Sequence, residues 1–111
     1  MNIIVKARHM DVTDAMRQHV ESKVGKLPRY YDGIQTIEVI LDTEADKAVV
    51  EILVTARRKT TFVATHRDED MYTGIDQCIR KVTEQIRRHK DKVRDRQGTP
   101  LGETMEEASQ E

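Results

Sequence analysis

Two long runs of alternating apolar residues constrain the fold of this chain more than any other feature. Residues 34–42 and residues 48–56 alternate between apolar and polar side chains, which is the period of a half-buried β-strand. The apolar members that would share a buried face are Ile37, Val39, Leu41, Val50, Ile52, Val54 and Ala56. Because only a short turn at residues 44–47 separates the two runs, they predict a β-hairpin.

Shorter strand patterns lie on either side of this hairpin. Residues 2–8 alternate before it, and residues 60–66 follow it after the basic turn Arg57-Arg58-Lys59. This basic turn has two interpretations, a solubilising device that protects a sheet edge or a second contact with phosphate groups.

Two helical stripes complete the pattern. The first helix begins after Thr13, a good N-cap, and its apolar stripe is Met16, Val20, Val24 and Leu27. Gly25 and Pro28 predict that this helix stops near Lys26 or Leu27.

The second helix has the stronger pattern. Its acidic start, Asp68-Glu69-Asp70, and its basic end follow the order that the helix dipole favours. Its apolar stripe is Met71, Ile75, Cys78, Ile79, Val82 and Ile86.

The resulting order is β-α-β-β-β-α, which predicts an α+β fold. We expect one mixed four-stranded sheet with both helices packed on one face, because this arrangement buries both apolar stripes. Residues 1–96 form the predicted domain. Residues 97–111 contain Gly, Pro and acidic residues that cannot support a packed element, so we expect a disordered acidic tail.

The residue types exclude several classes of function. We find no catalytic motif, so we expect no enzyme, no cofactor and no small-molecule substrate. Cys78 lies on an apolar stripe, so we expect a buried structural residue rather than a catalytic thiol. We interpret the acidic residues at 68–70 as the start of a helix rather than a metal site. No stretch is long and apolar enough for a membrane span or a signal region, so we expect a cytoplasmic protein.

The basic residues are the remaining functional signal. The chain carries 19 basic and 20 acidic residues, but four of the acids follow position 98, which leaves residues 1–97 at about +3. At 100° per residue the bases of the second helix form two groups, one of Lys81, Arg88 and Lys92 and the other of Arg80, Arg87 and Arg94. The first helix carries His19, Lys23 and Lys26 along one flank, followed by Arg29.

If the two helices lie side by side, one basic flank of each faces the same groove. Such a strip suits the phosphates of a folded RNA, while aromatic residues, at 4%, are too scarce for base stacking. A solvated helix surface would carry the same charges. Glu84 argues against binding, since it lies one turn from both Arg80 and Arg88 and can pair with either.

The string Asp70-Met71-Tyr72-Thr73-Gly74-Ile75-Asp76 and its basic continuation, Lys81-Val82, Gln85-Ile86 and His89-Lys90-Asp91-Lys92, resemble the second helix of a known family. This family comprises the ribosome hibernation-promoting factors and their relative, the ribosome-associated inhibitor called protein Y. The first helix is also similar, in the strings Val12-Thr13-Asp14-Ala15-Met16-Arg17 and Arg29-Tyr30-Tyr31. The resemblance covers roughly residues 1–95.

The resemblance implies a domain similar to double-stranded RNA-binding domains, in agreement with the order derived above. It implies binding to small-subunit rRNA in the channel for messenger RNA and transfer RNA, and a block of translation in stationary phase or stress. We expect a monomer off the ribosome. The basic residues by which the family contacts rRNA correspond in this sequence to Lys23, Lys26, Arg29, Lys81, Arg88, Lys90 and Lys92.

Three positions depart from the family pattern. Glu84 stands where the family often has Arg, Arg80 stands where Asp or Asn is common, and Pro28 replaces a frequent Glu. The acidic tail is similar to that of short family members whose tail obstructs ribosome pairing. The alternative interpretation is that the tail only increases solubility. The alternative function is a protein-interaction regulator of the sigma-factor-modulating type, with incidental RNA binding.

Overall fold

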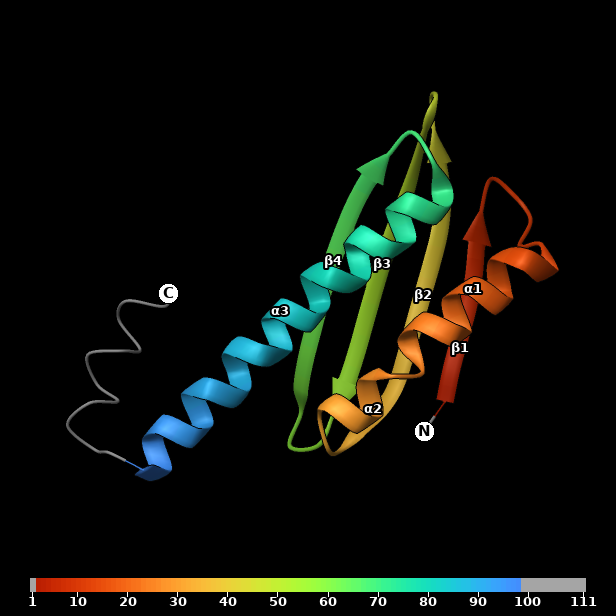
Figure 1. Ribbon diagram of the computed structural model, residues 1–111. Helices are drawn as coiled ribbons and strands as arrows, with labels where there is room; N and C mark the ends of the chain where they lie inside the picture. The colour runs from red at the N-terminus through yellow and green to blue at the C-terminus, as the bar shows by residue number, and fades with distance from the viewer. Residues whose placement is uncertain (1, 99–111) are drawn as a thin grey trace.

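The computed structural model describes residues 2–98, which form a four-stranded sheet and three helices (Figure 1). The elements are β1 (Asn2–Arg8), α1 (Asp14–Val24), α2 (Leu27–Tyr30), β2 (Ile34–Glu44), β3 (Lys47–Ala56), β4 (Thr60–Asp68) and α3 (Met71–Gly98). The predicted hairpin is β2 and β3, joined by a two-residue turn between Glu44 and Lys47.

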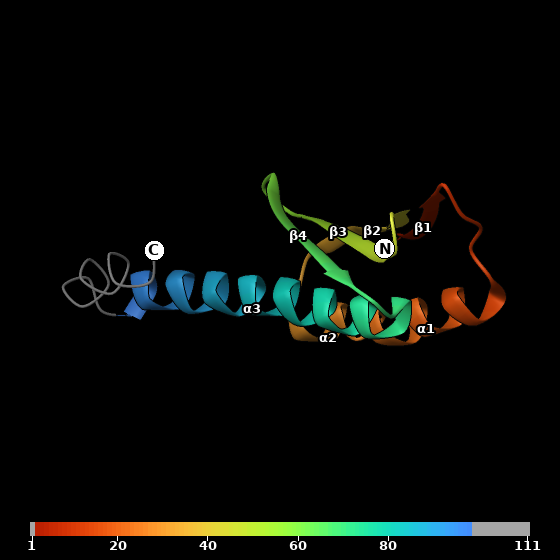
Figure 2. The same ribbon diagram turned by 90° about the horizontal axis from the view of Figure 1, so that it is seen from above.

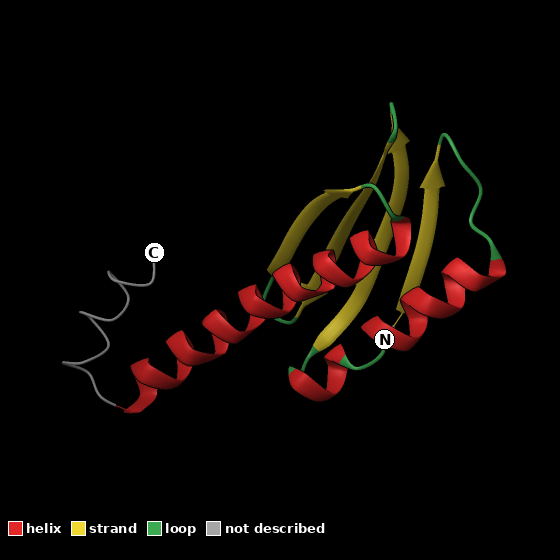
Figure 3. Cartoon of the chain, turned by 45° about the horizontal axis from the view of Figure 1, so that its top comes forward, coloured by secondary structure: helices red, strands yellow, loops and turns green. Residues whose placement is uncertain are grey.

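The strands lie in the order β1-β2-β3-β4, with β1 parallel to β2 and the other pairs antiparallel. A parallel neighbour requires a crossover connection, and α1 with α2 supplies it between β1 and β2. The helices lie on one side of the sheet (Figures 2 and 3). The mixed sheet with helices on one face is therefore confirmed.

The core lies between the helices and this face of the sheet. Alternate residues of β2 and β3 are fully buried there, as the period-two pattern predicted. The largest contributors with less than 2% exposure are Ile37, Val39, Leu41, Val50, Ile52, Val54, Val20, Val24, Ile75, Cys78, Val82 and Ile86. The stripes of α1 and α3 thus face the sheet and fix how each helix is rotated.

The first helix ends earlier than the sequence predicted. Thr13 is the N-cap, since its hydroxyl accepts from the Met16 amide at 3.1 Å, but α1 stops at Val24. A Cβ at position 25 would lie 2.8 Å from the Glu21 carbonyl oxygen, so glycine is required at this turn. The chain then forms the single turn α2, in which Pro28 occupies an early position that needs no amide hydrogen.

The acidic cluster starts α3, as predicted. The Asp70 carboxylate accepts from the Thr73 amide at 2.8 Å, which is an N-cap contact, and Asp68 accepts from the Asp70 amide at 3.1 Å. The helix continues to Gly98, two residues past the predicted domain boundary. The remainder of the predicted tail, residues 99–111, lies outside the described residues.

Two absences concern possible functions of the described part of the chain. Within residues 2–98, no helix combines the length and the apolar composition that a membrane span needs. The same residues hold no group of three or more side chains suited to bind a metal ion.

The turn between β2 and β3 provides a first prediction. Ala45 has φ +54°, a left-handed conformation in which a Cβ destabilises the folded state by about 1–2 kcal/mol. A glycine removes this strain, but its greater freedom in the unfolded chain lowers the stability by about 0.4–1 kcal/mol. Ala45→Gly should therefore stabilise the protein by about 0.5–1 kcal/mol in urea denaturation. Ala15→Gly, in the exposed part of α1, is the control and should destabilise it. Equal losses for both variants would contradict the prediction.

The buried thiol provides a second prediction. Cys78 is fully buried and donates to the carbonyl oxygens of Val50 and Ala64, both at 3.4 Å, and burial raises the pKa of its thiol to about 12. Because only the thiolate is alkylated, iodoacetamide at pH 8 should react roughly a thousandfold more slowly with the folded chain than with the urea-unfolded chain. Equal rates, followed by mass spectrometry, would contradict the structural reading of Cys78.

Candidate nucleic-acid interface

α1 and α3 are joined by a polar contact through His19. Its Nε2 lies 2.8 Å from Oδ1 of Asp76 on α3, and its ring meets the Tyr72 ring edge-on with centroids 5.2 Å apart. Since Lys23 is one helical turn after His19, it lies on the flank of α1 that faces α3. The predicted side-by-side arrangement of the two helices is therefore present.

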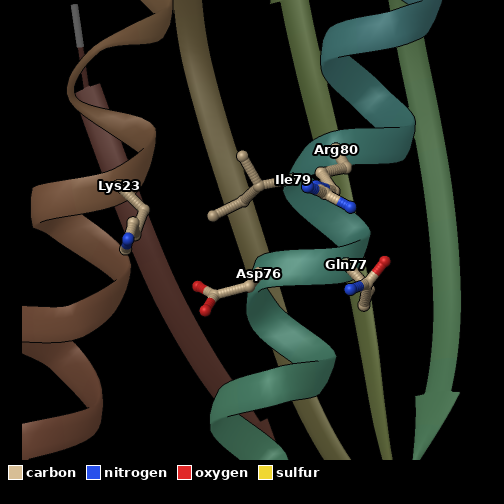
Figure 4. Close-up of a pocket in the computed structure, with 5 residues that line it drawn as sticks. All are labelled: Lys23, Asp76, Gln77, Ile79 and Arg80. Atoms are coloured by element: carbon tan, nitrogen blue, oxygen red, sulfur yellow. The ribbon is translucent and has the colours of Figure 1, made fainter.

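A groove of about 390 Å³ lies between the two helices. It is lined by Lys23 of α1 and by Asp76, Gln77, Ile79 and Arg80 of α3 (Figure 4). Lys23 and Arg80 are both exposed and have no ion pair among residues 2–92, whose side chains the structure describes. The structure thus brings together one basic residue from each helix, with the Asp76 carboxylate beside them.

A second hollow, of about 420 Å³, follows the outer face of α3. Its lining residues are Gln77, Arg80, Lys81, Glu84, Gln85 and Arg88. Gln77 and Arg80 line both hollows, so the two lie next to each other. We call the four basic residues along them, Lys23, Arg80, Lys81 and Arg88, the helical basic surface.

Lys81 lies at the edge of the sheet rather than in the groove between the helices. Its Nζ donates to the Thr65 carbonyl oxygen of β4 at 3.0 Å. One turn later, the Gln85 side chain donates to the Val63 carbonyl at 2.6 Å and accepts from the Val63 amide at 3.2 Å. An ammonium has three donors, so Lys81 retains two for a ligand.

Glu84 holds two of the predicted basic residues. Its carboxylate accepts from Arg87 and, at 3.3 Å, from Nε of Arg88, while Arg87 also donates to Asp91 at 2.9 Å. Hydrogen bonding from Arg87 holds the pKa of Glu84 below its usual value. The sequence suggested pairing with Arg80 or Arg88. The structure confirms the pairing with Arg88 and adds Arg87, whereas Arg80 stays outside this network.

Lys90 has a structural contact. Its Nζ donates to the Tyr30 carbonyl oxygen at 2.8 Å and lies 4.1 Å from the centroid of the Tyr30 ring, so it fastens α2 to α3. The sequence had no signal for this contact, because it joins residues 60 positions apart.

The other predicted contacts lie at the margins of the surface. Lys26 and Arg29 are exposed, in the turn after α1 and on α2, and line neither hollow. Lys92 is partly buried near the end of the described side chains. Sequence reasoning missed Gln77 and Ile79 as groove-lining residues, because neither carries a charge.

The four aromatic side chains contact other side chains of the domain. Tyr31 and Phe62 meet with ring centroids 5.8 Å apart, and both contact the His89 ring. Tyr30 lies against Lys90, and Tyr72 against His19. The helical basic surface therefore provides cationic groups and hydrogen-bond donors, but none of its members is an aromatic platform for bases.

Residues 3–94 match the model of a family described as Sigma 54 modulation protein / S30EA ribosomal protein. The chain is 35% identical over 97 residues to the ribosome hibernation promoting factor of Azotobacter vinelandii. This alignment covers 87% of this chain and 90% of that protein.

Two solved structures share the fold. A ribosomal subunit interface protein from Coxiella burnetii matches with TM-score 0.76 and 25% identity, over 82% of this chain and 99% of that one. The N-terminal domain of Protein Y from Thermus thermophilus matches with TM-score 0.73 and 33% identity, over 80% of this chain and 99% of that one. These matches confirm the resemblance and the fold predicted from the sequence.

Proposed function

The chain belongs to the Sigma 54 modulation protein / S30EA ribosomal protein family, and on that premise we propose that it is a non-enzymatic ribosome hibernation factor. It binds rRNA of the small ribosomal subunit in the channel that messenger RNA and transfer RNA use. Occupying that channel blocks translation in stationary phase or stress. The protein acts in the cytoplasm, without a cofactor, and is a monomer off the ribosome.

The observation that carries this proposal is the shared groove of α1 and α3. Lys23 and Arg80 line it from opposite helices, and Lys81 and Arg88 extend the charge along α3. Each phosphate that such a surface neutralises releases condensed counterions, which favours binding without any base contact.

The charge arrangement favours direct roles for some residues over others. Lys23, Arg80, Lys81 and Arg88 make the central phosphate contacts, and Lys26, Arg29 and Lys92 make peripheral ones. Arg87 and Lys90, which are engaged by Glu84 and Tyr30, contribute through the position of their charges. The aromatic residues are engaged inside the domain, which favours recognition of RNA shape and backbone over base stacking.

Charge reversal at the groove tests the proposal. Lys23→Glu combined with Arg80→Glu should abolish co-sedimentation of the chain with small subunits, because both residues are exposed and face the same groove. With single reversals, the slope of log K against log salt should fall by about 0.7–0.9 per lost phosphate contact.

The control is Arg8→Glu with Arg17→Glu, which changes the net charge equally at two exposed residues outside both helical hollows. It should retain most of the binding, and circular dichroism should show that both variants stay folded. Unchanged binding after the groove reversal would refute the proposal. A wild-type chain that remains in the light fractions would favour the protein-interaction regulator.

Glu84 provides a further prediction. Glu84→Gln removes the carboxylate that neutralises Arg87 and Arg88, so binding to small subunits should tighten and the salt slope should steepen by about 0.7–0.9. Glu69→Gln is the control, since Glu69 is also ion-paired, with Lys47 at 3.2 Å, and lines neither hollow. Equal effects of the two variants in a filter-binding titration would contradict the prediction.

A further inference from the structure

The turn between β3 and β4 has an unusual residue choice for its backbone. The Arg57 carbonyl oxygen accepts from the Thr60 amide at 3.2 Å, which closes a four-residue turn with Arg58 and Lys59 at its centre. Their φ angles are +61° and +60°. Positive φ at both central positions is the mark of a type I′ turn, which strongly favours Asn-Gly because a Cβ is strained there.

In the neighbouring segment, the chain uses glycine where the backbone needs a positive φ angle. Gly33 has φ +96°, so a glycine stands where a left-handed backbone is needed beside this turn. The turn itself instead holds two long cationic residues in strained conformations. Single residues with positive φ occur elsewhere, at His9 and Ala45, so strain alone assigns no role. The β3–β4 turn differs because both central residues are long, exposed cations, which points to a role for the side chains themselves.

Arg57 anchors the turn to the start of β2. Its amide donates to the Gly33 carbonyl at 3.1 Å, and its guanidinium lies 3.4 Å from the Asp32 carboxylate. Its side chain also packs over Gly33, where a Cβ would meet it at 3.0–3.2 Å. Asp32 therefore neutralises Arg57, while the anchored backbone sets the directions of the two residues that follow.

Arg58 and Lys59 are left as exposed cations. Both are exposed, and neither side chain has a hydrogen bond or ion pair with any of the side chains described, those of residues 2–92. Their turn projects away from the layer that contains α1 and α3 (Figure 2). The turn that carries the two cations is therefore separate from the helices that carry the helical basic surface.

We propose that the β3–β4 turn is a second phosphate-binding site, in which Arg58 and Lys59 contact the backbone of structured RNA. This inference rests on the proposed function and specifies its partner. An RNA that contacts both the helices and this turn must surround the domain on more than one side. The partner is therefore a concave, folded RNA and not a single straight duplex.

The test replaces the turn with the residues its backbone favours. Arg58→Asn with Lys59→Gly relieves the strain, so the midpoint of thermal unfolding should rise by roughly 4 °C or more. The same variant loses two phosphate contacts. Its affinity for small subunits should fall about tenfold, and its salt slope by about 1.4–1.8. The two readouts move in opposite directions, so instability does not explain the loss.

The control variant is Arg8→Gln with Arg17→Gln, which removes the same net charge from two exposed residues outside the turn. If the turn variant binds as this control does, while Lys23→Glu with Arg80→Glu still abolishes binding, the second site is refuted and the proposed function stands. If the wild-type chain does not bind small subunits, both proposals fail.

Discussion

The docking of one apolar stripe of α3 against the sheet determines where every other side chain of that helix lies. Ile75, Cys78, Val82 and Ile86 are fully buried, so the rotation of the helix is fixed. Side chains about 100° to one side then face α1, and those about 100° to the other side reach the edge of β4. Asp76 meets His19 on the first side, and Lys81 and Gln85 meet β4 on the second.

The β4 edge shows how the same helix protects the sheet. An edge strand presents unpaired amide and carbonyl groups that invite pairing with other chains. The Gln85 side chain pairs with both backbone groups of Val63 as another strand would, and Lys81 caps the Thr65 carbonyl. Lys81 therefore serves the sheet edge and the basic surface together, which its position beside the buried stripe allows.

The sequence predicted the elements whose evidence is local. The alternation of β2 and β3, the stripe and acidic start of α3 and the cap at Thr13 each depend on residues close in the chain. The end of α1 was predicted too late because the restart at α2 depends on how Gly25 and Pro28 combine with burial of Leu27.

The site was less predictable, for a physical reason. Helical spacing placed Arg80 on a flank of α3, but only tertiary packing decides which flank faces Lys23. Spacing also allowed Glu84 to pair with Arg80, and the structure instead pairs it with Arg87 and Arg88. The Lys90–Tyr30 contact depends on where α2 lies, so no pattern along the chain could predict it.

The net charge of −1 does not decide whether this chain attracts a polyanion. At physiological salt, screening limits the interactions of each exposed charge to a range of about 8 Å. The local separation of basic from acidic residues therefore matters more than the net charge of the chain. Lys23 and Arg80 of the helices and Arg58 and Lys59 of the β3–β4 turn have no paired acid among the side chains that the structure describes, whereas Glu84 and Asp91 pair with Arg87. Attraction to phosphate is therefore set by which bases the fold leaves unpaired, and on α3 it is limited by Glu84 together with Asp91.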